Sequence, residues 1–118
     1  MKNILVVDDE ENLRHLFEGE LSEEGYSVET ARGAEEALVM IASRQPDLVT
    51  LDIKMPGMGG KEALRVIREK YPDIAVVMLT AFTEFKADFD LWSADAYVVK
   101  SSDLTELKTK IRYLLLGE

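Results

Sequence analysis

The feature that most constrains the fold is the alternation of two apolar patterns along the chain. Short, nearly continuous runs rich in β-branched residues occur at 4–7, 48–51, 75–79 and 96–99. Such runs are typical of strands that are covered on both faces of a parallel sheet. A fifth run, 27–31, alternates apolar and polar residues instead, which predicts an edge strand with one wetter face.

The stretches between these runs carry apolar residues at helical spacing. The repeating positions are Leu13, Leu16, Phe17 and Leu21, then Ala34, Ala37, Leu38 and Ile41, then Ala63, Leu64 and Ile67, and finally Leu104, Leu107, Ile111 and Leu114. Gly25, Pro46 and Pro72 follow the first three stretches as stop signals, and Ser102 or Asp103 can cap the last.

Strands that alternate with helices predict an α/β fold, in which a parallel sheet has helices on both faces. Each crossover between parallel strands should be right-handed. The chain has 118 residues, which is the size of one ordinary domain, and no linker or internal repeat divides it. We therefore expect one domain over residues 1–118.

Charge and composition exclude several classes of function. The net charge of −9 argues against direct binding of a nucleic-acid backbone, which needs a basic surface. The chain has no cysteine, so disulfides, thiolate metal sites and cysteine nucleophiles are excluded. No apolar run has the length of a membrane span, and the N-terminus does not have the layout of a signal peptide. The expected location is the cytoplasm, with no membrane partner.

The residues that follow the strands form the candidate site, because ligands of open parallel sheets bind beyond the carboxyl ends of the strands. Asp8 and Asp9 follow the first strand, Asp52 ends the third, Thr80 ends the fourth and Lys100 ends the fifth. Three neighbouring carboxylates repel one another unless a cation neutralises them. Oxygen ligands suit Mg²⁺, and a backbone carbonyl in the loop after the third strand could complete its shell.

Such a site can form an acyl phosphate. A carboxylate beside Mg²⁺ can attack a phosphoryl group. The metal and Lys100 would neutralise the phosphoryl oxygens, and Thr80 can donate a hydrogen bond to one of them. Taken singly, each of these residues is more often a turn, strand or surface residue; their common position at one edge of the sheet favours a shared function.

Four segments of the chain resemble the receiver domains of two-component response regulators. They are Val6–Glu10, Pro46–Gly60, Met78–Ala81 and Ala94–Lys100. In this order and spacing they are highly specific, and the match covers essentially the whole chain. The resemblance implies a flavodoxin-like doubly wound fold with strand order 2-1-3-4-5, which agrees with an edge strand at 27–31.

The resemblance also implies a phosphoacceptor and its metal site. Asp52 would accept a phosphoryl group from a sensor histidine kinase or a phosphotransfer domain. Asp9 would bind Mg²⁺ directly and Asp8 mainly through water. Asp52 and the backbone carbonyl of Lys54 would complete the protein ligands, with Mn²⁺ as an alternative ion.

Further roles follow from the same resemblance. Thr80, Ala81 and Lys100 would bind the phosphoryl oxygens. On phosphorylation, Thr80 would move toward the phosphate and Tyr97 would turn inward as the switch aromatic; without the resemblance, Tyr97 would be taken as a half-buried strand residue. Lys54 and Phe82 occupy positions where the family tunes the rate of dephosphorylation.

The chain departs from the family near its C-terminal half. Ser101 stands where the family usually has a proline in a cis peptide, so a trans bond or a strained cis exception is expected. Gly59 replaces a common acidic residue, a change expected to be minor. The segment between Thr80 and Lys100 is shorter than usual, which predicts a short or irregular fourth helix.

That short segment carries a stripe of aromatic residues, Phe82, Phe85, Phe89 and Trp92. The stripe is expected to belong to the core, with a partner surface as the alternative. In the family, the fourth helix, fifth strand and fifth helix form the output face. Homodimerisation through that face is therefore a further expectation.

Two other classes of function compete with the phosphorylation switch. A haloacid-dehalogenase-type phosphohydrolase would need Asp-x-Asp after the first strand and a cap insertion, and a nucleotide-binding protein would need a glycine-rich loop there. None of these three features is present. A phosphorylation-independent interaction module of the same fold remains the alternative. The expected protein is not an enzyme with an outside substrate, although it promotes its own phosphorylation and dephosphorylation.

Overall fold

The computed structural model describes residues 1–81 and 93–118. The strands in these ranges are β1 (Asn3–Val7), β2 (Ser27–Ala31), β3 (Leu48–Asp52), β4 (Ala75–Thr80) and β5 (Ala96–Val99). The helices are α1 (Glu11–Glu23), α2 (Ala34–Ser43), α3 (Gly60–Lys70) and α4 (Thr105–Leu116). The helix predicted between β4 and β5, with its aromatic stripe, lies outside the described residues, so α4 is the last helix of the chain.

All five strands are parallel, in the order β2-β1-β3-β4-β5. This confirms the predicted fold class and the position of β2 at an edge of the sheet. The chain reverses its direction of travel across the sheet between β1 and β3, which makes this the topological switch point. Because Asp52 pairs with Leu79 and Thr80 with Val99, the side chains that follow β3, β4 and β5 emerge at the same edge of the sheet.

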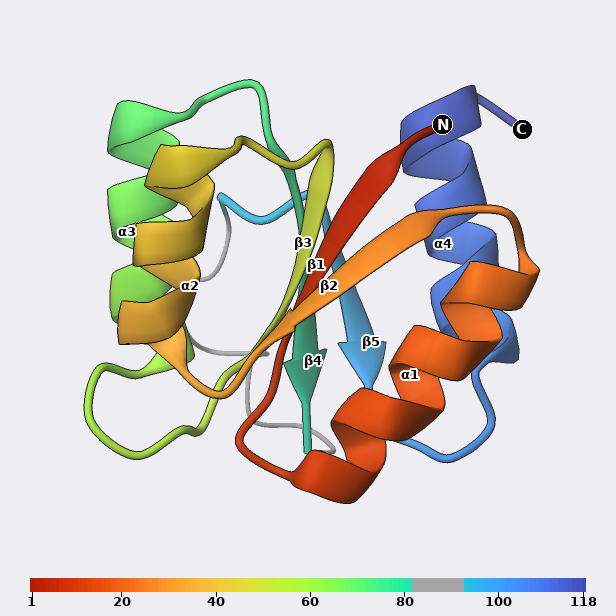
Figure 1. Cartoon of the computed structure of the whole chain (residues 1–118), viewed down its shortest axis with the longest axis horizontal. Helices are drawn as coiled ribbons and strands as arrows, with labels where there is room; N and C mark the ends of the chain where they lie inside the picture. Colours follow the sequence, from red (N-terminus) through yellow and green to blue (C-terminus); the bar gives the residue numbers. More distant parts are fainter. Residues whose placement is uncertain (82–92) are drawn as a thin grey trace.

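Helices cover both faces of the sheet (Figure 1). Helices α2 and α3 pack on one face, and α1 and α4 pack on the other. Every residue of β3 is buried, as expected for a central strand between two helical layers. None of the helices in the described ranges has the length and hydropathy that a bilayer-spanning segment needs.

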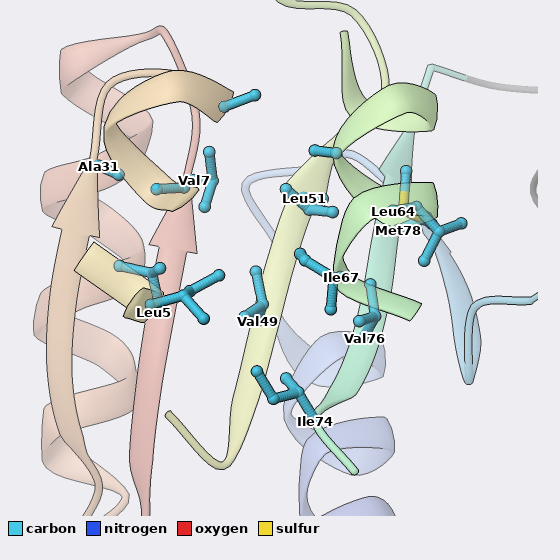
Figure 2. Packing of buried hydrophobic residues seen from close by; sticks show 14 of the residues in the cluster. Leu5, Val7, Ala31, Val49, Leu51, Leu64, Ile67, Ile74, Val76 and Met78 are labelled. Carbon is cyan, nitrogen blue, oxygen red and sulfur yellow. The ribbon is translucent and has the colours of Figure 1, made fainter. Parts of the chain in front are cut away.

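Alternate residues of each central strand enter opposite cores. Leu5, Val49 and Val76 face α2 and α3, where Leu64 and Ile67 pack against them (Figure 2). Their neighbours along the strands face α1 and α4; this second cluster includes Ile4, Val6, Leu48, Val77, Phe17, Leu21, Leu107 and Ile111. The two cores fix the sheet between its helical layers, and thereby fix the strand ends relative to one another.

Two local features set the start of the helices beside the site. A Cβ atom on Gly60, the first residue of α3, would lie 2.3 Å from the Asp52 carbonyl oxygen, so the helix begins directly against the end of β3. At the start of α4, Asp103 Oδ1 accepts hydrogen bonds from the amide and hydroxyl of Thr105, at 3.0 and 2.7 Å. The N-cap residue of α4 is Leu104, which makes no side-chain cap hydrogen bond, so the prediction that Ser102 or Asp103 is the cap was wrong by one or two residues. Asp103 nevertheless satisfies the amide of Thr105, the first residue of the helix.

The backbone also resolves two expectations from the sequence. Gly25, the predicted stop of the first helix, has φ of +98°, a conformation that glycine adopts at low cost. No cis peptide bond occurs in the described ranges, so the Lys100–Ser101 bond is trans.

Both chain ends lie at the edge of the sheet opposite the end of β3 (Figure 1), where Met1 and Leu116 line one hollow.

Candidate phosphoacceptor site

The predicted site residues come together at the carboxyl edge of the sheet. Asp8 follows β1, Asp52 ends β3 and Lys100 follows β5, and the Lys100 side chain reaches across the end of β4 to both aspartates. The Lys100 amide donates to the Thr80 carbonyl at 2.7 Å, which extends the β4–β5 pairing to the site. Four of the five strands therefore carry these groups on one rigid sheet.

Three carboxylates form a cluster at this edge. Asp8, Asp9 and Asp52 each offer an oxygen, and these oxygens lie within 4.8 Å of one another. Asp8 is fully buried and Asp52 is 6% exposed, whereas Asp9 is exposed to solvent. Buried carboxylates this close need a compensating cation, and a set of oxygen ligands with one open side suits Mg²⁺. The residues present therefore fit the ion that the sequence predicted.

Lys100 supplies part of the compensating charge. Its Nζ atom lies 2.7 Å from Asp52 Oδ2, 3.2 Å from Asp8 Oδ2 and 3.0 Å from Glu10 Oε1. The Lys100 side chain is only 17% exposed and both aspartates are buried, so the ion pairs with Asp8 and Asp52 are poorly screened by water. Within residues 1–81 and 93–118, Asp8 Oδ2 accepts no hydrogen bond despite this ion pair, which leaves that buried oxygen available to a further partner.

Burial and charge shift the protonation equilibria of the central pair. Burial raises the pKa of the Asp52 carboxyl, and the charge of Asp8 adds to the effect; the hydrogen bond and charge of Lys100 act in the opposite direction but do not cancel it. Burial by itself would lower the pKa of Lys100, but its hydrogen bonds to Asp52 and Glu10 raise it above the ordinary value. Lys100 therefore stays charged throughout the physiological range.

Backbone amides orient the two buried carboxylates, and a side chain holds the backbone of Asp8. The Lys54 amide donates to Asp52 Oδ1 at 3.3 Å, and the Glu10 amide donates to Asp8 Oδ1 at 2.9 Å. Arg14 Nη1 donates to the Asp8 carbonyl at 2.8 Å, which ties the start of α1 to the end of β1. These bonds fix the orientation of Asp52 and Asp8 before any ligand arrives.

Thr80 is placed as a donor. Its side chain is fully buried, and its hydroxyl has no hydrogen-bond partner in the described part of the chain. A buried hydroxyl without a partner is costly, so a ligand oxygen at this position would satisfy it. Ala81 follows at the surface, and together with Asp52 and Lys100 it lines a hollow of about 270 Å³.

Tyr97, the predicted switch aromatic, lies on β5 outside this hollow. Its ring is half-buried and packs against the core that α2 and α3 share with the sheet, and burial raises the pKa of its hydroxyl. It also lines a second hollow with Tyr113 and Leu114 of α4. Phe82, the other residue assigned to dephosphorylation tuning besides Lys54, lies outside the described residues.

Sequence reasoning gave no role to two residues that contact the site. Glu10 has no predicted role beyond its place in the segment Val6–Glu10, yet its carboxylate pairs with Lys100. Arg14 carries no signal beyond its position in the first turns of a helix, and its contact is with a backbone carbonyl. The adjacency of Glu10 to Asp8 and Asp9 was the one available clue.

A family model, the response regulator receiver domain, matches residues 4–112. The chain belongs to this family. The matched range includes Asp8, Asp9, Asp52, Thr80 and Lys100. The match confirms the resemblance drawn from the four sequence segments.

Individual relatives support the same assignment. The receiver domain is 43% identical over 115 residues to the response regulator MprA of Mycolicibacterium vanbaalenii, covering 95% of this chain and 49% of the relative. It is 43% identical over 117 residues to the probable transcriptional regulator ycf27 of Cyanophora paradoxa, covering 97% of this chain and 48% of that protein. The chain thus spans about half the length of these curated relatives.

Two solved structures are similar to the receiver domain throughout. Both contain the response regulator TrrA of Thermotoga maritima, which is 50% identical to this chain. One is a complex with Mg²⁺-BeF, with a TM-score of 0.93 and coverage of 98% of this chain and 100% of that chain. The other is a complex with the histidine kinase ThkA, with a TM-score of 0.90 and coverage of 98% and 99%.

Proposed function

We propose that this receiver domain accepts a phosphoryl group on Asp52 and acts as a phosphorylation-controlled switch. The observation that carries the proposal is the position of Asp52, whose carboxylate is almost fully buried and lies 2.7 Å from Lys100 and beside two further carboxylates. The complex of TrrA with Mg²⁺-BeF supports the proposal, because the TrrA sequence is 50% identical to this chain.

The chemistry assigned to Asp52 is a displacement at phosphorus. A carboxylate oxygen of Asp52 forms a bond to the phosphorus atom, while the bond from phosphorus to the donor breaks and its electron pair leaves with the donor group. Lys100 would pair with a phosphoryl oxygen, and Thr80 and the amide of Ala81 would each donate a hydrogen bond to another. The Lys54 amide orients the attacking carboxylate.

Asp8, Asp9, Asp52 and the backbone carbonyl of Lys54 would hold Mg²⁺, with Mn²⁺ as a substitute. The ion supplies charge neutralisation for the phosphoryl oxygens and for the three carboxylates. Without it, the excess of negative charge at this edge would oppose the approach of an anionic donor. The proposed reaction is therefore dependent on a divalent cation.

A sensor histidine kinase or a phosphotransfer domain is the proposed donor. The complex of TrrA with ThkA supports a kinase partner. Phosphorylation would shift the population between two conformers, with Thr80 moving toward the phosphate and Tyr97 turning inward. Four further expectations remain predictions. They are homodimerisation through the face that includes β5 and α4, tuning of dephosphorylation by Lys54 and Phe82, a cytoplasmic location, and the lack of direct nucleic-acid binding.

Intact-mass measurement after incubation with acetyl phosphate and Mg²⁺ tests the central proposal. The wild-type chain should gain the mass of one phosphoryl group, and Asp52→Ala should not. Glu29→Ala on the edge strand β2 provides a control in which another carboxylate is removed. An adduct that persists in Asp52→Ala would place the phosphate elsewhere, and no adduct on the wild type would favour a phosphorylation-independent interaction module.

A further inference from the structure

The loop that follows Asp52 is held from a second helix. Glu35, in the first turn of α2, points its carboxylate at this loop, and Glu35 Oε2 accepts a hydrogen bond from the Met58 amide at 3.1 Å. Residues 53–59 join β3 to α3, so this contact links the helix after β2 to the chain just beyond the phosphoacceptor.

A glycine makes the contact possible. Gly57 has φ of +76°, and a Cβ atom there would lie 2.8 Å from Glu35 Oε2. The carboxylate therefore occupies space that a side chain at position 57 would fill. The close approach to Gly57 and the hydrogen bond from Met58 are two separate observations. Both place Glu35 over the outer half of the loop, which is defined here as Gly57 and Met58.

The inner half of the loop is anchored independently. Ile53 donates to the Leu79 carbonyl at 3.1 Å, and Gly60 donates to the Ile53 carbonyl at 2.9 Å. Met55 is buried in the core that α2 and α3 share. Lys54, whose carbonyl is the proposed third protein ligand of the metal, lies between the anchored residues Ile53 and Met55 and precedes the segment that Glu35 contacts by three residues.

We propose that Glu35 is a positioning residue for the metal site: by holding the loop through Met58 and Gly57, it keeps the Lys54 carbonyl in place for Mg²⁺. The inference rests on the proposed function, because that function assigns the carbonyl to the ion. Groups that orient metal ligands commonly change metal affinity by about 10- to 100-fold when they are removed. Because Glu35 is exposed and acts through the backbone, a smaller effect is expected here.

Calorimetric titration with Mg²⁺ provides the first test. Glu35→Ala should weaken Mg²⁺ binding about three- to tenfold, whereas Glu35→Gln, whose amide oxygen can still accept from Met58, should remain near the wild type. Glu62→Ala is the matched control, because Glu62 is an exposed carboxylate in the first turn of α3. Equal binding by Glu35→Ala and wild type, or an equal loss in Glu62→Ala, would overturn the proposal.

Two further readouts separate positioning from general destabilisation. In the metal-free protein, hydrogen exchange at the Met58 amide should accelerate in Glu35→Ala and stay slow in Glu35→Gln. With acetyl phosphate, Glu35→Ala should need more Mg²⁺ for half-maximal phosphorylation but should reach the wild-type rate at saturation. A lower maximal rate with an unchanged Mg²⁺ requirement would contradict the positioning role.

The outcomes distinguish this proposal from the function on which it rests. A wild-type chain that binds Mg²⁺ but accepts no phosphate would refute the proposed function, while the calorimetric comparison would still decide the role of Glu35. A wild-type chain that is phosphorylated, with Glu35→Ala equal to it at every Mg²⁺ concentration, would refute the role of Glu35 alone. A wild-type chain that binds no Mg²⁺ would refute both.

Discussion

Lys100 Nζ lies 2.7 Å from Asp52 Oδ2, although β4 separates the strands that carry the two residues. The side chain crosses the end of β4, where Thr80 holds its buried hydroxyl. The ammonium group thus already occupies the position from which it would pair with a phosphoryl oxygen on Asp52. Lys100 is thus the ion-pair partner of Asp52 in this structure, and under the proposed function it would also stabilise the phosphorylated state.

Replacing Lys100 by methionine is expected to slow phosphorylation and to raise the pKa of Asp52. The rate with acetyl phosphate should fall about 100-fold or more, because one fixed positive donor to the transferring group is lost. The pKa should rise because Lys100 is the group that lowers it. Carbon-13 NMR of the Asp52 carboxyl and the rate of adduct formation measure the two effects.

Lys110→Met supplies the control for this change, because Lys110 is an exposed lysine of α4 and its loss alters the net charge equally. It should leave the rate and the pKa of Asp52 near their wild-type values. Similar behaviour of the two variants would show that Lys100 acts only through net charge.

Replacing Asp52 by asparagine is expected to stabilise the metal-free protein at neutral pH. The pKa of Asp52 is raised on folding, so its contribution to stability is present below the unfolded value of about 3.8 and is lost as pH rises through the folded value. The advantage of Asp52→Asn should therefore be full at pH 7 and should vanish as pH falls toward 3.8. Thermal unfolding across this range measures the difference.

Magnesium should reverse the order of the same two proteins. An ion that binds the folded state stabilises it by mass action, and the wild type offers one more carboxylate than Asp52→Asn. Added Mg²⁺ should therefore raise the melting temperature of the wild type more. A metal-free Asp52→Asn that melts below the wild type at pH 7 would contradict the assigned pKa direction.

Two glycine-to-alanine changes are expected to have opposite signs. Gly60→Ala should destabilise the protein by about 1–3 kcal/mol, because the new Cβ would overlap the Asp52 carbonyl oxygen and the Ile53 Cα atom. Gly19→Ala should stabilise it by about 0.5–1 kcal/mol, since Gly19 lies inside α1 with open space around it. Urea unfolding of both variants tests the pair, and equal effects would show that the packing under Asp52 is looser than described.

Replacing Arg68 by alanine is expected to cost about 2–3 kcal/mol of stability. Its guanidinium donates to the carbonyls of Ile74 and Ser93, at 2.7 and 2.6 Å, and forms an ion pair with Asp95. These bonds fasten α3 to the chain that enters β5. Denaturant unfolding should show the loss, whereas Arg65→Ala, at an exposed position of the same helix, should be nearly neutral.

The strands and most of the helices could be predicted because burial on both faces leaves a strong signal. The central run 48–51 became β3 with every residue buried, and the alternating run 27–31 became the edge strand β2. The strand ends followed from these boundaries, so the meeting of Asp8, Asp52 and Lys100 was predictable from topology alone. The helix expected between β4 and β5 lies outside the described residues.

Contacts between exposed side chains and loop backbone could not be predicted in the same way. Glu35 reaches Met58 only because the loop places its amide over the first turn of α2, and periodicity says nothing about the path of a loop. Glu10 was visible in the acidic run, but its pairing with Lys100 depends on the side-chain orientation of both residues. The switching role of Tyr97 stays a prediction, since a half-buried strand aromatic is compatible with either interpretation.

The shared position of Met1 and Leu116, opposite the end of β3, has a practical consequence. A tag, dye or surface tether attached at either terminus would stand a full strand length away from Asp52. Kinase and small phosphodonors should therefore reach an immobilised protein unhindered. The same geometry allows both ends to be labelled together without placing a probe against the acidic cluster.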